Sequence, residues 1–517
     1  AAPVSARAAA LRAAADLYEA HRAEFFQLLC QEAGKTVVDC IGELREAVDF
    51  LRYYADEAER FDGTALGSFS CISPWYFPLA IFSGQIAAAL GSGNGVLAKP
   101  AESTSLIAHF AVDLLHKAGV PTGALVLVPG IGAEVGPVLC GDPKITGVCF
   151  TGSTATAQAI HRTMADHLDP GAPLIAETGG LNAMIVDSTA LPEQAVRDVI
   201  ARAFQSAGQR CSALRCLYVQ EDIAETFKEM LFGAMDALTV GDPRDMATDV
   251  GPVIDQAAFD RITAHIDQGQ VLHQVAAPHG QFVPPTVLAV PGIEALREEI
   301  FGPVLHLATY RAQDFDKVVR AINATGYGLT FGIHSRIDER VQEVISDVEA
   351  GTLYVNRGQI GAIVGSQPFG GHGLSGTGPK AGGPLYLSQF QTGSDGGAVS
   401  QSLPGPTGES NRYAVTPKSQ VVCFGPDAAS DAAWAKHHGV DAEVFAGTME
   451  ALVQRDVIDL VIGSGPDLAD LRRALAAREG AIVQVRRRET ALPLLHIERA
   501  VCIDITAAGG NVDLLGA

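Results

Sequence analysis

The chain has 517 residues, 47% of them hydrophobic and 19% charged, which is too long for a single hydrophobic core. We expect several domains of a compact α/β protein that is rich in helices and tight turns. The formal net charge of −22 argues against nucleic-acid binding, because it repels a phosphate backbone and no Lys/Arg-rich block offsets it.

The nine cysteines are scattered, with no CxxC pair and no zinc-type spacing to histidine. We therefore expect reduced thiols, a cytoplasmic location and no metal. No apolar run approaches the roughly 20 residues that span a bilayer, and residues 1–20 lack the order of a signal peptide, so we expect no membrane segment. The chain begins without methionine and in a helical pattern, so one interpretation is a fragment of a longer protein.

The first part of the chain predicts helices followed by a parallel sheet. From Ala8 to about Arg60, apolar residues recur at helical spacing. Short β-rich runs then alternate with helices, which is typical of βαβ units. These runs are 70–72, 95–99, 124–129 and 147–150, with a helix over 105–118 among them.

A second series of strand-like runs predicts a second α/β domain. Its members are 174–186 (Leu174 through Asn182 to Val186), 217–220, 304–310, 330–333 and 352–356. Residues 391–412 are dense in Gly, Ser and Pro, which is the composition of a linker. Beyond them the runs at 421–424, 442–445, 457–465 and 481–485 alternate with helices and predict a small Rossmann-like unit.

Two residues suggest covalent chemistry. Cys211 follows small and polar residues in AGQRCSALR, although a single cysteine is more often a buried small hydrophobe. Its candidate proton partner is Glu177 in AETGG, where a Gly pair turns the backbone sharply at the carboxyl end of a strand. A solvated or capping carboxylate is the alternative for Glu177. The Gly–Ser turn of FTGST suits a pyrophosphate, or is an ordinary capped turn.

Six segments together resemble the aldehyde dehydrogenase superfamily in order and spacing: VLAKPAE, FTGST, AETGG, GQRCSA, EEIFGPV and QPFGG. Within it, LIAETGGLNAMIVDSTALPEQ, SAGQRCSALR and the long YVNRGQIGAIVGSQPFGG stretch are most similar to the glutamate-semialdehyde (pyrroline-5-carboxylate) dehydrogenase half of bifunctional proline-utilisation flavoproteins, the PutA family. The resemblance covers roughly residues 1–390. Long members of that family carry an extra C-terminal domain, which residues 413–500 fit.

The resemblance implies an α/β aldehyde dehydrogenase fold with a Rossmann-like NAD-binding domain. We expect N-terminal helices and that domain over 1–174, joined by about 375–390. A catalytic domain is expected over 175–374 and a linker over 391–412. A small Rossmann-like domain with a structural role is expected over 413–500, with a tail over 501–517.

The implied activity is NAD+-dependent oxidation of L-glutamate γ-semialdehyde to L-glutamate. Cys211 is the implied nucleophile, and Glu177 activates the water that cleaves its thioester. The residues implied to hold NAD are Lys99, Glu102, Gly152, Ser153, Gly179, Glu299 and Phe301. Those implied to hold the substrate are Ser212, Arg210, Gly361, Ala362, Phe369 and Phe77. Glu102 favours NAD over NADP, because a carboxylate repels a 2′-phosphate.

One position departs from the superfamily pattern. CISPWYFPLAIF places Tyr76 where Pro-Trp-Asn-Phe normally supplies an Asn donor to the developing oxyanion. Three interpretations are open: a slow or silent catalyst, an altered donor geometry, or a substitution that is not native to the protein. The competing functional hypotheses are another semialdehyde as substrate, or a catalytically silent scaffold.

The partners implied are a small-molecule substrate and either a second copy of the chain or a proline dehydrogenase flavoprotein domain in cis. That flavin-binding half has no counterpart here, so FAD is not expected for this chain. Dimerisation through a β-flap would fall near residues 385–395 or close to Leu66.

Overall fold

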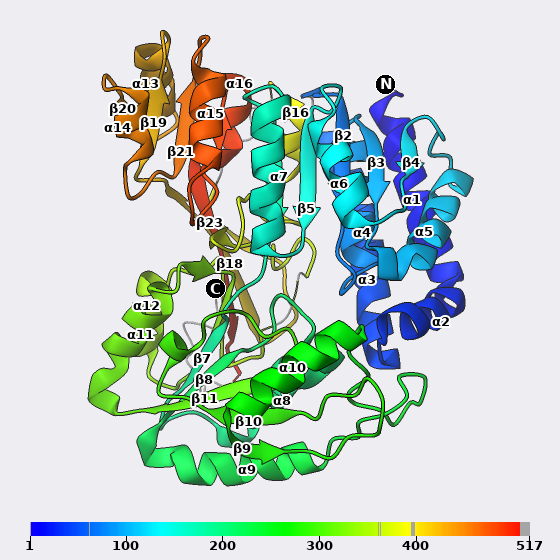
Figure 1. Ribbon diagram of the computed structural model, residues 1–517, viewed down its shortest axis with the longest axis vertical. Helices are drawn as coiled ribbons and strands as arrows, with labels where there is room; N and C mark the ends of the chain where they lie inside the picture. The colour runs from blue at the N-terminus through cyan, green and yellow to red at the C-terminus, as the bar shows by residue number, and fades with distance from the viewer. Residues whose placement is uncertain (1, 62, 360, 362, 394–398, 507–517) are drawn as a thin grey trace.

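The computed structural model describes residues 2–61, 63–359, 361, 363–393 and 399–506 (Figure 1). The three N-terminal helices predicted from residue 8 to residue 60 are α1 (Val4–Ala20), α2 (Arg22–Ala33) and α3 (Val37–Arg60). Helix α3 begins with a capping box in which the Thr36 hydroxyl accepts from the Asp39 N–H and the Asp39 carboxylate accepts from the Thr36 N–H.

The first sheet has five parallel strands in the order β4-β3-β2-β5-β6. The strands are β2 (Ser68–Ile72), β3 (Gly95–Lys99), β4 (Leu125–Leu127), β5 (Gly147–Thr151) and β6 (Leu174–Glu177). The helices between and after them are α4 (Ala80–Gly91), α5 (Ser105–Lys117), α6 (Gly132–Gly141) and α7 (Thr154–His167). The assignment of residues 174–177 to the second series was wrong, because these residues pair with β5 and complete the first sheet.

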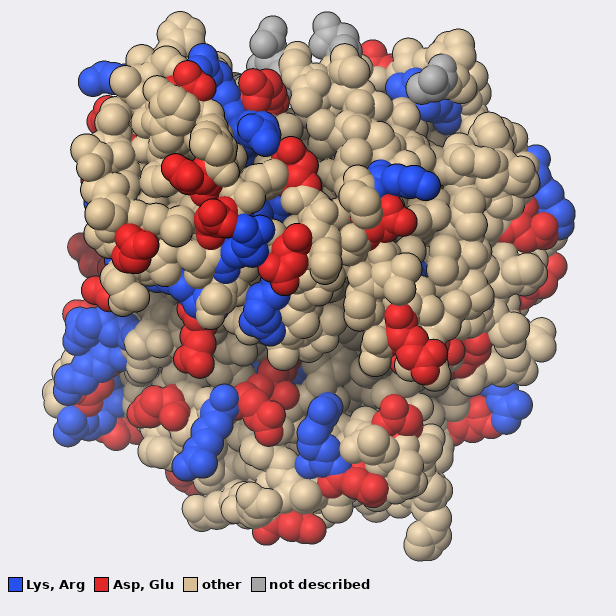
Figure 2. Space-filling model, turned by 45° about the horizontal axis from the view of Figure 1, so that its top comes forward, with Lys and Arg blue, Asp and Glu red and all other residues tan. Residues whose placement is uncertain are grey.

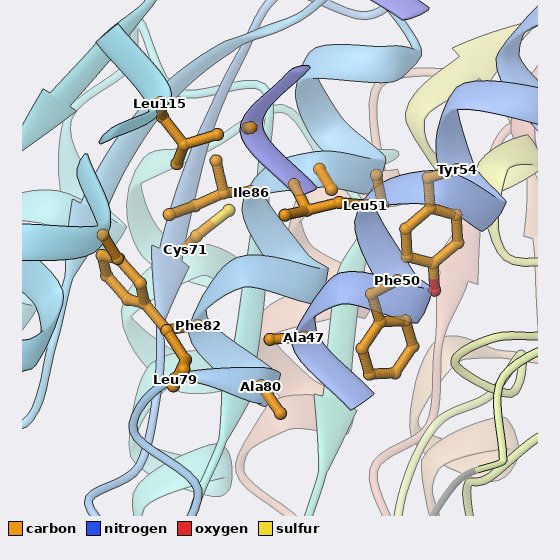
Figure 3. Close-up of a cluster of buried hydrophobic side chains, with 14 of the residues drawn as sticks. Ala47, Phe50, Leu51, Tyr54, Cys71, Leu79, Ala80, Phe82, Ile86 and Leu115 are labelled. Carbon is orange, nitrogen blue, oxygen red and sulfur yellow. The ribbon is translucent and has the colours of Figure 1, made fainter. Parts of the chain in front are cut away.

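Helices α3 and α4 pack against each other and form the largest buried core with α1, α2 and α5. Figure 3 shows Phe50 and Tyr54 projecting from α3, and Phe82 and Ile86 from α4. Helices α6 and α7 cover the other face of the sheet. The N-terminal helices thus brace α4, whose preceding loop carries Tyr76.

The second sheet has ten strands in the order β17-β18-β23-β14-β13-β7-β8-β11-β10-β9. The strands from β23 to β10 are parallel, and the edge strands are antiparallel. Those from the middle of the chain are β7 (Ala183–Val186), β8 (Cys216–Gln220), β9 (Gln270–Gln274), β10 (Thr286–Ala289), β11 (Val304–Tyr310), β13 (Thr330–His334) and β14 (Thr352–Val355).

Helices cover both faces of this sheet (Figure 1). One face is covered by α8 (Pro192–Phe204), α9 (Ala224–Asp236) and α10 (Gln256–Gln268). The other is covered by α11 (Phe315–Asn323) and α12 (Asp338–Asp347). Burial on both faces explains the continuous apolar runs that predicted these strands.

Residues 391–412 are not simply a linker, as the sequence had suggested. They contain β17 (Gln401–Leu403) and the start of β18 (Glu409–Pro417), which pairs antiparallel with β23 (His496–Asp504). Strand β23 includes the first residues of the expected tail and lies beside β14. Both proposed flap positions also come together, since β1 (Thr64–Ala65) pairs with β16 (Gln391–Thr392).

Between β18 and β23 lies the small Rossmann-like unit, a four-stranded parallel sheet in the order β20-β19-β21-β22. Its strands are β19 (Val421–Phe424), β20 (Ala442–Val444), β21 (Leu460–Gly463) and β22 (Val485–Arg486). Its helices are α13 (Ala428–His437), α14 (Met449–Val453), α15 (Leu468–Ala476) and α16 (Arg488–Ala491). The strand expected at 481–485 is mostly irregular and begins only at Val485.

The small unit contacts the first sheet's domain through buried polar groups. The guanidinium of Arg472 donates to the carbonyls of Asp169 and Ala172, and Gln484 donates to the Leu174 carbonyl. Within the described residues, no helix is both long and apolar enough to cross a membrane. On the face drawn in Figure 2, acidic and basic side chains are interspersed, and the surface is hollowed near its centre.

Candidate active site

The loop that carries Cys211 is formed by an unusual backbone turn after α8. Ser206, Ala207 and Gly208 all have positive φ, at 54°, 53° and 66°. A Cβ at Gly208 would lie 2.1 Å from the Gly302 carbonyl oxygen, so only glycine fits there. Left-handed non-glycine residues cost about 1–3 kcal/mol each and cluster at functional sites. This turn brings Cys211 to the carboxyl end of the first sheet.

Asn182 holds the loop that carries Cys211 through hydrogen bonds to its backbone. Its amide nitrogen donates to the carbonyls of Cys211 at 2.7 Å and Ala213 at 2.9 Å, and its oxygen accepts from the Thr330 N–H at 3.2 Å. No role was predicted for this residue from the sequence. A polar residue between the Gly pair and a fully buried strand was the available signal.

Glu177 is the last residue of β6, so its predicted place at the carboxyl end of a parallel strand is confirmed. Its Oε2 accepts from the Gly371 N–H at 3.0 Å, and its Oε1 has no hydrogen-bond partner among the described residues. Burial raises the pKa of Glu177 to about 8. A carboxylate of that basicity suits a general base near neutral pH.

Cys211 and Glu177 line one narrow pocket. The sequence-predicted substrate residues that the pocket brings together with them are Ser212, Gly361, Phe369 and Phe77. Ala362 lies outside the described residues. Arg210 does not line the pocket: its guanidinium forms an ion pair with Asp39 at 2.6 Å and lies 5.5 Å from the centre of the Phe77 ring. Arg210 thus supports the pocket wall from behind.

Glu46 of α3 also lines this pocket and was not assigned a role from the sequence. Its Oε2 lies 4.0 Å from the position that a Cβ on Gly361 would take. Burial raises the pKa of Glu46 to about 8, and the nearby Glu43 adds to the rise. Its helical periodicity indicated only packing, because the pocket forms from segments more than 160 positions apart in the chain.

Cys211 is 8% exposed as a residue, and burial raises the pKa of its thiol to about 12. The negative carboxylates of Glu299, Glu177 and Glu46 raise it further. The thiol is therefore protonated at neutral pH and needs a base to become a nucleophile. Among the described residues, no cluster of His, Cys, Asp and Glu is arranged to hold a metal ion.

A cleft of about 820 Å³ lies beside the pocket. It is lined by all the sequence-predicted cofactor residues: Lys99, Glu102, Gly152, Ser153, Gly179, Glu299 and Phe301. Ser153 caps the N-terminus of α7 by accepting from the Thr156 N–H at 3.2 Å, which leaves a helix N-terminus facing the cleft. Gly132 lies close to Lys99 and Glu102. A Cβ atom on Gly132 would make only ordinary van der Waals contacts with their side chains. The donors at Lys99 and at the α7 N-terminus, the acceptor at Glu102 and the volume of the cleft fit a dinucleotide.

Tyr76 lines the cleft and lies within electrostatic range of Cys211. Its ring centre is 5.0 Å from that of Phe301 and 5.6 Å from that of Trp75. Burial raises its pKa well above the usual value, and the charges of Cys211, Glu299 and Glu177 add to the rise. The hydroxyl therefore stays protonated at neutral pH, on a side chain much larger than asparagine.

The aldehyde dehydrogenase family model matches residues 1–393, and the chain belongs to this family. A bifunctional PutA protein of Klebsiella aerogenes is 43% identical over an alignment that covers 98% of this chain and 46% of that protein. A 1-pyrroline-5-carboxylate dehydrogenase of a Geobacillus species is 38% identical over 74% of this chain and 79% of that enzyme. The chain therefore spans less than half the length of the PutA relatives it matches.

Solved structures agree with this placement. A crystal structure of bifunctional proline utilization A superposes with a TM-score of 0.74 at 52% identity, over 75% of this chain and 42% of that one. A Thermus 1-pyrroline-5-carboxylate dehydrogenase with bound NAD superposes with a TM-score of 0.71 at 35% identity, over 75% and 80%. The predicted aldehyde dehydrogenase fold is confirmed.

Proposed function

We propose that this chain oxidises L-glutamate γ-semialdehyde, the open form of 1-pyrroline-5-carboxylate, to L-glutamate with NAD+ as the oxidant. The observation that carries the proposal is one pocket that contains the Cys211 thiol, the Glu177 carboxylate and two polar groups suited to an α-amino acid. The relatives named pyrroline-5-carboxylate dehydrogenase support the same substrate.

The two polar groups recognise opposite charges. Glu46 faces the position of an α-ammonium group, and Ser212 with the backbone at Gly361 faces that of an α-carboxylate. Glu46 and Gly361 are adjacent, as the two groups on one α-carbon require. Phe369 and Phe77 enclose the aliphatic stem between this end and the thiol. An unpaired charge in such a pocket would cost several kcal/mol, so these contacts select an amino-acid aldehyde.

The cleft residues would hold NAD. Lys99 and Glu102 supply a donor and an acceptor for ribose hydroxyls, and the α7 N-terminus at Ser153 suits the pyrophosphate. The carboxylate of Glu102 disfavours a 2′-phosphate and hence NADP. Bound in this cleft, NAD+ supplies the acceptor for the hydride that leaves the substrate carbon.

The residues of this chain carry the remaining steps. A carboxylate in the pocket takes the thiol proton, and the Cys211 sulfur adds to the aldehyde carbon. After oxidation, the substrate is held on Cys211 as a thioester. Glu177 then takes a proton from water, whose oxygen attacks the thioester carbon and releases glutamate and the thiol.

A slow or catalytically silent chain is the second candidate, and Tyr76 is the observation that favours it. A buried aromatic ring fills the place of the usual asparagine and packs against Phe301. Loss of an oxyanion donor costs roughly 10²- to 10³-fold in rate. The presence of both Cys211 and Glu177 favours a slow enzyme over a silent scaffold.

We also propose the surroundings in which the chain acts. It works in a cytoplasm-like compartment, where the nine described thiols stay reduced. Its partner is a proline dehydrogenase flavoprotein domain in cis or a second copy of the chain. The chain divides into an NAD-binding domain and a catalytic domain, with Glu177 at the boundary between them. The small Rossmann-like unit between β18 and β23 has a structural role.

The test is NADH formation at 340 nm with pyrroline-5-carboxylate beside succinate semialdehyde, which lacks the α-amino group. The proposal predicts a higher kcat/KM for pyrroline-5-carboxylate. Equal values would reject the amino-acid specificity, and no NADH from either substrate would favour the silent scaffold.

A further inference from the structure

One peptide unit separates Glu177 from a buried cation. The Gly371 N–H donates to Glu177 Oε2 at 3.0 Å, while the Gly370 carbonyl accepts from the Lys380 ammonium. The C=O and N–H of a trans peptide lie in one plane and point in opposite directions. Lys380 and Glu177 therefore bind opposite edges of the same rigid group.

The fit on the Glu177 side is close. A Cβ on Gly370 would lie 2.7 Å from Glu177 Oε1, so a side chain there would displace the carboxylate. Any rotation of the peptide unit that breaks the Lys380 contact also turns the Gly371 N–H away from Glu177. The ammonium thus controls the direction of the donor to the base.

Lys380 is held in turn by the C-terminal part of the chain. Its side chain is fully enclosed and reaches Thr352 Oγ1 at 3.3 Å, while its backbone N–H donates to Glu498 Oε2 at 2.8 Å. The Tyr413 hydroxyl donates to the other oxygen of Glu498. Glu498 is on β23 and Tyr413 on β18, the two strands that flank the small unit.

Several charged side chains from the surrounding elements act on the Lys380 ammonium. Glu498 and Glu177 favour its cation, and Arg499 opposes it. Lys418 faces Glu498, and His372 faces Lys380, Arg499 and Lys418. Burial lowers the pKa of Lys380 to about 8, and burial also keeps His372 neutral. Among these groups Glu498 favours the Lys380 cation most, and burial raises the pKa of Glu498 itself.

We propose that Lys380 is a positioning residue for Glu177 in thioester hydrolysis, acting through the Gly370–Gly371 peptide and supported by Glu498 of β23. The strand after the small unit would then contribute directly to the deacylation step. This inference rests on the proposed function, since it concerns the thioester that Cys211 forms.

The sign of the pH effect follows from the charges. Glu177 must be ionised to take a proton from water, so hydrolysis rises with pH through its pKa. The cation of Lys380 and the Gly371 donor both lower that pKa. The pKa of Lys380 is itself about 8, so its cation acts below that pH, and without it the midpoint of the hydrolysis rate against pH moves to higher pH.

The experiment compares the parent chain with Lys380→Met, Lys380→Arg and Glu498→Gln. Thr352→Val is the matched control, because it removes the other side-chain contact of Lys380 and keeps the charge. Each protein reacts with NAD+ and pyrroline-5-carboxylate at a series of pH values from 6 to 10. The samples are quenched with acid and analysed by mass spectrometry of the intact protein. The fraction of chain held as thioester and the NADH burst are read from the same samples.

For Lys380→Met we expect a normal burst, accumulated thioester, hydrolysis slower by about tenfold and a midpoint shifted upward. Thr352→Val should keep the parent midpoint, Lys380→Arg should keep or lower it because arginine stays charged, and Glu498→Gln should slow hydrolysis to a lesser degree. A normal burst with an unchanged midpoint in Lys380→Met would overturn the proposal. No NADH from the parent at any time would instead reject the proposed function. If Lys380→Met fails to fold, an unchanged hydrolysis rate in Glu498→Gln overturns the proposal and a reduced rate with a normal burst supports it.

Discussion

Arg215 and Glu299 form an ion pair in which Arg215 Nη2 lies 2.9 Å from Glu299 Oε1. The same guanidinium donates to the carbonyls of Gly208 and Arg210, in the segment that leads to Cys211. It also lies 5.1 Å from the centre of the Phe301 ring. The carboxylate proposed for the cofactor is thereby tied to the nucleophile loop. The resemblance to aldehyde dehydrogenases implied that Cys211 and Glu299 share one site, and Arg215 shows what joins them.

Replacing Arg215 with methionine should destabilise the fold and weaken cofactor binding together. Removing one partner of a buried ion pair costs about 3–5 kcal/mol, because it leaves the other charge uncompensated. Urea unfolding should show that loss, and quenching of Trp fluorescence by NAD+ should show weaker binding, since Trp75 lies at the cleft. Arg244→Met removes an exposed pair with Asp242 and should change stability by less than about 1 kcal/mol. Equal stability for both variants would show that the Arg215 pair is not structural.

Replacing Tyr76 with asparagine should raise kcat. Asparagine restores the amide donor and removes the ring against Phe301, and such a donor is worth roughly 10²- to 10³-fold. Tyr76→Phe separates two effects: a lower kcat than the parent shows that the hydroxyl already donates, and an unchanged kcat shows that the ring only occupies space. Steady-state NADH kinetics measure both variants. An unchanged kcat in Tyr76→Asn would mean that this position does not limit turnover.

Replacing Glu46 with glutamine should raise KM for pyrroline-5-carboxylate and leave KM for succinate semialdehyde nearly unchanged. A hydrogen bond to a charged group is worth about 1.5–3 kcal/mol, which is about 10- to 100-fold. In the parent, KM for the amino-acid substrate should fall as pH rises through the pKa of Glu46, about 8, because the ionised carboxylate binds the ammonium. The variant should lose this pH dependence. Parallel changes for the two substrates would place Glu46 outside the recognition of the amino group.

The free Cys211 thiol should react slowly with iodoacetamide at neutral pH. Burial and three neighbouring carboxylates raise its pKa to about 12, so the thiolate fraction and the rate should rise about tenfold per pH unit up to pH 10. Peptide mass spectrometry distinguishes Cys211 from the other eight cysteines, which are also buried. A rate that levels off below pH 9 would contradict this environment for the thiol.

The sequence predicted those features that local patterns encode. The strands Gly95–Lys99 and Val304–Tyr310 have the predicted bounds, because their apolar runs are buried on both sides. Glu409–Pro417 was missed because its partner, His496–Asp504, is distant in the chain and its own Gly-rich surroundings indicate a loop. Glu46, Asn182 and Lys380 were missed for a related reason: their role depends on which distant segment they face, and periodicity reports only burial.

The measurement that tests the central claim most directly is NADH formation from NAD+ and pyrroline-5-carboxylate by the parent chain, Cys211→Ala and Cys216→Ala. Cys216 is also buried, and it lies in β8 away from the pocket, so it controls for loss of a core thiol. We predict NADH from the parent and Cys216→Ala, and none from Cys211→Ala. NADH formation that survives in Cys211→Ala would contradict the account.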